Sequence, residues 1–231
     1  MNAERRAKRE RDSARSLSGH ERTRRFAWRW SHKRVVEGVP VGVFLLSRDE
    51  REAAFEKIAL ALALLRRHCP RRFAHLRRDV GCVLVLSASG LAGVWIDRLR
   101  VCELNVDYLL DAAPADVAST LAHEAMHARL YRRGLGYTEG GERARIEAAC
   151  YRAERAFARR LPPAIRGPEM AEKADRCVRA LLDPSSDFSE RYYSDKAYFA
   201  AKVQGLRGAG TPEWLVRAAV AMGRRHQRRR R

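Results

Sequence analysis

The segment from Pro114 to about Arg133 constrains the fold of this chain more than any other part of the sequence. Proline is favoured in the first turn of a helix, and Gly134 and Gly136 follow the last helical position, so the segment reads as one helix. Apolar residues cover most of its circumference, which predicts a helix buried on nearly all sides. They are Val117, Ala118, Leu121, Ala122, Ala125, Met126 and Leu130.

The one polar stripe of this helix contains His123 and His127. Positions four apart lie one turn apart on the same face, so both imidazoles could bind one metal ion. Glu124 projects to the flank of that face, where it could act as a general base without being a ligand. The segment therefore predicts a catalytic metal site. Two hydrogen-bonded core histidines without a metal are the alternative interpretation.

A catalytic zinc site needs a third protein ligand and one open position. We expect Glu147 to be this ligand, because it lies on the next predicted helix, residues 142–160, at the edge of an apolar arc. The glycine-rich stretch between the two helices allows the chain to reverse. Glu142 and Glu154 are the alternative ligands. The other histidines of the chain lack partners at ligand spacing, so we expect them to be ordinary residues.

The remaining pattern predicts an α+β fold. A small, mostly antiparallel sheet is expected to pack on the helix that contains His123, with further helices towards the C-terminus. Extended chain is expected at residues 35–46, and Ser47 or Asp49 can cap a helix that ends before Pro70. The expected strands are 82–86, 91–96 and 101–106, and the expected later helices are 168–182, 189–206 and 212–226.

The net charge of +19 is concentrated at the two ends of the chain, and we expect the chain to consist of four parts. Residues 1–34 hold 12 Lys or Arg against 4 acids, and we expect them to form a basic arm that cannot fold alone. Residues 35–165 form the expected core, 166–223 a helical part and 224–231 a basic tail. Rings and cations alternate in the arm, which suits contact with nucleic acid. They are Arg24, Arg25, Trp28, Arg29, Trp30, Lys33 and Arg34.

Two further features bear on the compartment. The longest apolar run, residues 58–65, is far shorter than the ~20 residues that cross a bilayer, and the first residues lack the apolar stretch of a secretory signal. The cysteines are odd in number and form no CxxC pair, which favours reduced core residues. We therefore expect a cytoplasmic protein without a membrane span. The cysteines are Cys69, Cys82, Cys102, Cys150 and Cys177.

Taken over residues 48–163, the chain resembles the gluzincin zinc metallopeptidases. The resemblance lies in a helix, a small sheet, an HExxH helix with His123 and His127, and a glutamate, Glu147, on the following helix. The segment IEAACYRAERAFARRL is similar to the glutamate helix of minimal intracellular members. Tyr151 stands where such proteins often carry an acidic residue. The metzincin pattern does not match, because Arg133 occupies the place of its third histidine.

The resemblance implies a zincin fold and a zinc-dependent metallopeptidase. Glu124 would assist the attack of a zinc-bound water on a peptide or protein substrate, with His123, His127 and Glu147 as the metal ligands. The substrate would lie along a sheet edge, at residues 93–96 or 101–105, with Trp95 as a possible lining residue. Candidate phenols for oxyanion stabilisation are Tyr137, Tyr192, Tyr193 and Tyr198. The alternative is a nucleic-acid-binding or regulatory protein on a zincin scaffold with little or no peptidase activity.

Overall fold

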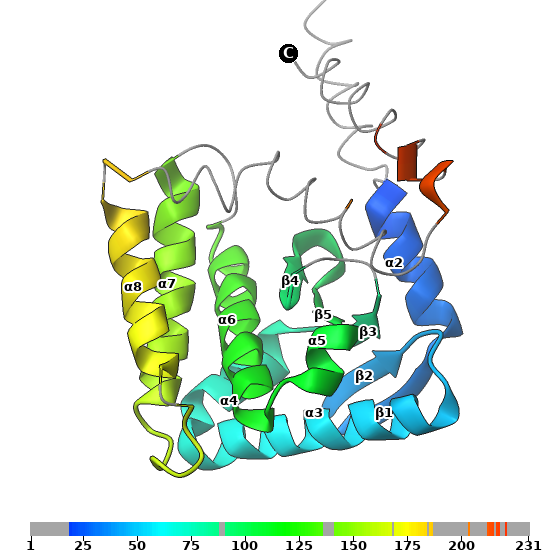
Figure 1. The fold of residues 1–231 in the computed structure, drawn as a ribbon, viewed down its shortest axis with the longest axis horizontal. Coiled ribbons are helices and arrows are strands. Elements are labelled where there is room, and N and C mark those ends of the chain that lie inside the picture. The colour runs from blue at the N-terminus through cyan, green and yellow to red at the C-terminus, as the bar shows by residue number, and fades with distance from the viewer. Residues whose placement is uncertain are drawn as a thin grey trace, which may run out of the picture.

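The computed structural model describes residues 19–87, 91–135, 141–167, 169–183 and 185–186, together with 203, 212–214, 216–217 and 220. The described part is α+β, with seven α-helices and one five-stranded mixed sheet (Figure 1). The predicted helices at 189–206 and 212–226 fall mainly outside the described residues. None of the helices in the described residues is long and apolar enough to cross a membrane.

Helix α3 (Arg48–His68) begins at the predicted cap. The Ser47 hydroxyl accepts a hydrogen bond from the Glu50 backbone N–H, and the Glu50 carboxylate accepts one from the Ser47 N–H at 3.0 Å. This reciprocal pair satisfies backbone donors that the first helical turn leaves open. Helix α4 (Pro70–Asp79), which the sequence analysis did not predict, starts immediately after α3 with Pro70 in its first turn.

The sheet has the order β1-β2-β3-β5-β4. Its strands are β1 (His32–Val36), β2 (Val39–Val43), β3 (Cys82–Leu86), β4 (Gly93–Ile96) and β5 (Val101–Asn105). The two outer pairs, β1–β2 and β4–β5, are antiparallel, whereas β2–β3 and β3–β5 are parallel. The prediction of a mostly antiparallel sheet is therefore wrong. The prediction failed because α3 and α4 connect β2 to β3, and a helical crossover allows the next strand to run parallel.

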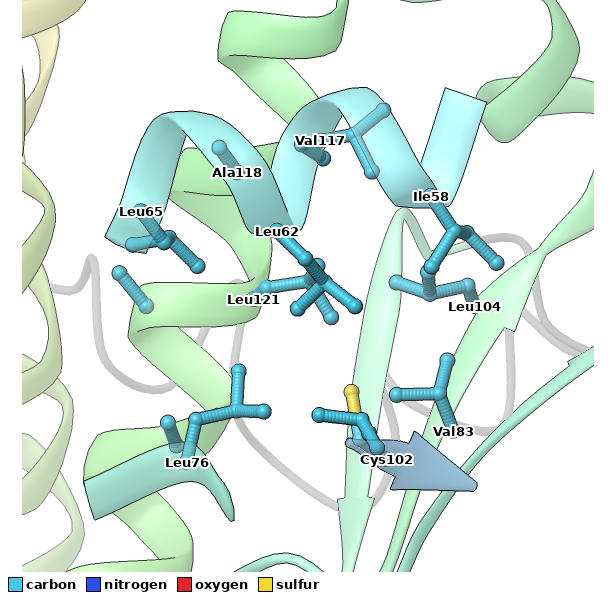
Figure 2. Close-up of a cluster of buried hydrophobic side chains, with 14 of the residues drawn as sticks. Ile58, Leu62, Leu65, Leu76, Val83, Cys102, Leu104, Val117, Ala118 and Leu121 are labelled. Carbon is cyan, nitrogen blue, oxygen red and sulfur yellow. The ribbon is translucent and has the colours of Figure 1, made fainter. Parts of the chain in front are cut away.

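The main core lies between one face of the sheet and the helices α3, α4 and α6 (Pro114–Arg132). Figure 2 shows Leu62 of α3 and Leu121 of α6 pointing towards each other, with Leu104 of β5 beside them. All three side chains are fully buried. Helix α6 is thus enclosed by the sheet and by its neighbouring helices, as its apolar circumference predicts. The short helix α5 (Val106–Asp111) connects β5 to α6.

The other face of the sheet is covered by α2 (Gly19–Trp30). Ala27 is buried there in one apolar cluster with Leu84 and Val101. Residues 19–34, which were expected to belong to an arm unable to fold alone, instead form α2 and part of β1, so that boundary is wrong. The physical reason is a tertiary contact that composition does not reveal. Residues 1–18 and 224–231 lie outside the described part of the chain.

Helices α7 (Gly141–Ala158) and α8 (Met170–Leu182) complete the described structure. Helix α7 packs between α6 and α8, which lie on its two sides in Figure 1. The predicted bounds of the helix at 142–160 agree with those of α7 within two residues. All five cysteines are free thiols, and four of them are buried, in agreement with their predicted place in the core.

Candidate metal centre

Two neighbouring helices bring the predicted ligands together. His123 and His127 lie one turn apart on α6, and their ring centroids are 4.9 Å apart. Glu147 projects from α7, and one of its carboxylate oxygens, Oε2, lies 3.2 Å from His123 Nε2 and 3.7 Å from His127 Nε2. All three side chains are buried. One oxygen of Glu147 thus faces the same nitrogen atom of each imidazole.

The two separations that involve Glu147 can be compared with those of a zinc site. Ligand atoms at about 2.0 Å from a tetrahedral zinc ion lie roughly 3.3 Å from one another. The two distances from Glu147 Oε2 to the Nε2 atoms lie close to that value. The donor types, two imidazoles and one carboxylate, are those of a catalytic zinc site that keeps a fourth position open. The residues present therefore fit a bound zinc ion.

Glu154 has a different place from the one considered in the sequence analysis. One of its oxygens lies 2.5 Å from Nδ1 of His123, and the other accepts a hydrogen bond from the Ser119 hydroxyl at 3.3 Å. Since a carboxylate only accepts, Nδ1 carries a hydrogen, so Nε2 is the nitrogen that would offer its lone pair to a metal ion on the side of Glu147 once it is deprotonated. Glu154 is thus a carboxylate that orients the imidazole, the usual partner of a metal-bound histidine.

Glu124 lies on the same helical turn as the histidine pair, where Gly93 of β4 comes close to α6. The Cβ that an alanine would carry at Gly93 would lie 3.2 Å from Glu124 Oε1 and 2.7 Å from the methyl carbon of Thr120. Only glycine lets the strand come this close to the helix. The carboxylate of Glu124 is buried, and Gly93 of β4 lies against it.

Three carboxylates, those of Glu124, Glu147 and Glu154, give this buried cluster a high negative charge. Burial alone would lower the pKa of His123, yet its contacts with Glu147 and Glu154 raise that pKa well above 6.5. Burial by itself would raise the pKa of Glu147, but hydrogen bonds with His123 and His127 hold it well below its ordinary range. Three carboxylates around two imidazoles favour positive charge at the centre of the cluster, and protons on the imidazoles or a metal ion can supply it.

Burial raises the pKa of Glu124, and the positive charges of His123 and His127 only partly offset this increase. A general base is most effective when its pKa approaches the working pH. The shift therefore moves Glu124 in the direction that acid–base catalysis requires.

Cys150 is a potential ligand that the sequence analysis placed only in the core. Together with His123 and His127 it forms a group whose possible ligand atoms all lie within 4.8 Å of one another. However, burial, followed by the charges of Glu147 and Glu124, raises the pKa of its thiol well above 9.0. A bound metal ion would itself displace the thiol proton, so Cys150 is an alternative third ligand, whereas Glu147 Oε2 already lies 3.2 Å and 3.7 Å from the two Nε2 atoms. The Glu147 carboxylate is the stronger candidate for the third position.

Other predicted site residues have different outcomes. Strand β5 lies between β3 and β4, so residues 101–105 are not an edge, whereas β4 is the last strand in the sheet order. Trp95 is buried in the main core. The phenols proposed for oxyanion stabilisation, Tyr137, Tyr192, Tyr193 and Tyr198, lie outside the described residues. Tyr151, in the expected acidic position, packs edge-on against the His123 ring at 4.9 Å.

Comparison with known proteins yields no relative: no protein-family model, curated protein or solved structure matches this chain. The function of the chain therefore has to be inferred from the geometry of the cluster itself.

Proposed function

We propose that the chain is a zinc-dependent metallopeptidase of the gluzincin type, with a zincin-like fold. The observation that carries the proposal is the position of Glu147 Oε2, 3.2 Å and 3.7 Å from the Nε2 atoms of two histidines on one helical turn. Together with Glu124 on the same turn, this set supports hydrolysis more strongly than a purely structural metal site, which would be closed by four protein ligands. His123, His127 and Glu147 would hold the metal.

A zinc ion in this position would supply Lewis acidity, which polarises a carbonyl group and makes water more acidic. The protein's own contribution is proton transfer and alignment. Glu124 would accept the proton from the attacking water and pass it to the amine that leaves, because its carboxylate is buried next to the ligands with a raised pKa. Glu154 would keep the His123 ring in one orientation during this step.

The sheet edge suggests how a peptide would bind. Strand β4 ends the sheet, and Gly93 lies against Glu124. An extended peptide that adds to the outer side of β4 would pass directly along the catalytic carboxylate, with its backbone held by strand-type hydrogen bonds. The free, mostly buried thiols agree with a reducing compartment, and we place the activity in the cytoplasm.

The proposal is tested with the Glu124→Gln variant. After loading with zinc, the wild type and the variant are compared on a library of quenched fluorescent peptides, and their zinc content is measured. The expected result is equal zinc content and a loss of cleavage of at least about 100-fold, in the range of a general base. Glu172→Gln, a change on the exposed side of α8, is the matched control. Cleavage by Glu124→Gln at the wild-type rate would refute this mechanism.

A further inference from the structure

Helix α2 presents two different sides. On its inner side, the Arg24 guanidinium contacts the Glu103 carboxylate of β5 at 2.6 Å, and both side chains are buried. Ala27 and Trp28 pack against the sheet on the same side. These contacts fix the rotation of α2, because a buried ion pair that loses one partner leaves a costly unpaired charge. The side chains on the outer side therefore have a defined placement.

The outer side exposes two aromatic rings. Phe26 is 57% exposed and Trp30 is 65% exposed, although both rings are large and apolar. Their centroids are 6.3 Å apart, and Phe26 also contacts the half-buried ring of Phe44 at 6.2 Å. Positions 26 and 30 are one turn apart, so both rings lie on one stripe. We call Phe26, Trp30 and Phe44 the aromatic patch.

Three arginines lie along this stripe. Arg22, Arg25 and Arg29 are exposed, and at 100° per residue they fall within about 60° of one another, next to Phe26. Within the described residues none of the three has an acidic partner, in contrast to Arg24 and Arg34, which pair with Glu103 and Glu52. The aromatic patch is therefore bordered by a row of positive charges that other described side chains do not neutralise.

We propose that the outer face of α2 binds single-stranded nucleic acid, with bases stacked on Phe26 and Trp30 and phosphates held by Arg22, Arg25 and Arg29. A single strand offers both an unpaired base face and regularly spaced negative charge, which are the two features that aromatic rings and arginines recognise. A duplex hides its base faces. An interfacial membrane helix buries its main apolar face in lipid, whereas the buried apolar side of α2 faces the sheet.

The structure changes the set of residues that were expected to contact nucleic acid because rings and cations alternate in the sequence. Arg24 and Trp28 face the sheet, and Arg34 is paired with Glu52, so these three leave the binding set. Phe26 enters it. The proposed surface and the metal centre lie on different sides of the molecule, since α2 and α7 occupy opposite sides of the view in Figure 1. Binding and cleavage can therefore be tested independently, and this inference goes beyond the proposed peptidase function.

Binding of the full-length chain to a labelled oligothymidylate is measured by fluorescence anisotropy over a series of salt concentrations. Two variants separate the two kinds of contact. The aromatic variant, Phe26→Ala with Trp30→Ala, is expected to bind at least about 30-fold more weakly at every salt concentration, with an unchanged salt slope. The arginine variant, with Gln at positions 22, 25 and 29, is expected to lower the slope by about 2, at roughly 0.7 per phosphate contact.

The matched control replaces three exposed arginines elsewhere, Arg67, Arg71 and Arg133, with Gln, so the net charge equals that of the arginine variant. It is expected to retain a steeper salt slope than the arginine variant. Equal slopes for the two charge variants, or wild-type affinity of the aromatic variant, would overturn the proposal. Tighter binding to vesicles of anionic phospholipid, or equal binding to polyglutamate, would also overturn it, because neither partner offers bases for stacking. Circular dichroism confirms that each variant is folded.

Discussion

Replacement of Glu154 tests whether the carboxylate orients His123 or serves only to fill space. Its oxygen lies 2.5 Å from His123 Nδ1, on the side of the ring opposite Glu147. Loss of such a partner typically weakens metal binding by 10–100-fold, which corresponds to about 1.4–2.7 kcal/mol. We expect Glu154→Ala to lie near the upper end of this range. Glu154→Gln should lie near the lower end, because the amide oxygen can still accept from Nδ1–H but carries no charge.

The assay is competition for zinc against a fluorescent chelator at constant pH. Ser119→Ala is the matched control, since it removes only the 3.3 Å hydrogen bond to the other oxygen of Glu154. Its affinity should stay within about threefold of wild type, because a neutral hydrogen bond contributes about 1 kcal/mol or less across a second contact. Wild-type zinc affinity in Glu154→Ala would refute the orienting role. Complete loss of zinc in that variant would instead identify Glu154 as a ligand.

Two further changes test the strand contact and the packing of α6. Gly93→Ala places a methyl group against Glu124 and Thr120, so we expect full zinc binding but at least about tenfold slower peptide cleavage. Gly167→Ala is the control, because the added carbon meets no other atom there, and it should cleave at the wild-type rate. Slow cleavage in both variants would contradict this reasoning. Asp79 is buried, and although burial would raise its pKa, hydrogen bonds from Arg78 and Arg132 lower that pKa from 3.8 to about 2. A carboxylate whose pKa is lowered by folding stabilises the fold above pH 3.8, and this stabilisation is lost as the pH falls towards 2. Asp79→Asn should therefore lower the free energy of unfolding by about 2 kcal/mol at neutral pH and by much less near pH 2. Urea denaturation at both pH values measures this difference, and a constant difference would show that the ion pairs contribute nothing.

The elements nearest the site could be predicted from the sequence because their signals are local. Pro114, the glycines after residue 133 and the apolar circumference define α6 within one residue. Ser47, one of the two predicted caps, marks the start of α3 in the same way. The i, i+4 spacing of His123 and His127 places both rings on one face in any α-helix. Such features need no knowledge of the rest of the chain.

The features that were missed depend on contacts between distant residues. Arg24 and Glu103 are far apart in the chain, so the sequence did not show that they form a buried ion pair. Without this contact, the charge-rich segment that contains Arg24 was expected to be unable to fold alone. The pairing of β2 with β3 depends on how α3 and α4 cross the sheet, which periodicity does not specify. These contacts decide the boundary of the fold and the direction of the strands.

The role of Glu154 was missed although a signal was present. Seven residues after Glu147, it lies on nearly the same side of α7, because two helical turns return to the same face. Which carboxylate meets Nε2 and which meets Nδ1 depends on the rotation of the His123 ring, and spacing alone does not give that rotation. The sequence therefore predicted the two acids as alternatives, whereas the structure brings both to the same imidazole.

The central claim is that His123, His127 and Glu147 together bind one zinc ion. The most direct measurement is the zinc content of the purified chain after equilibration with excess zinc and removal of free metal. We predict one zinc per chain for the wild type and for Glu172→Gln, and none for His123→Ala or Glu147→Gln. A wild-type chain that retains no zinc, or a Glu147→Gln variant that retains it while Cys150→Ser loses it, would contradict this assignment.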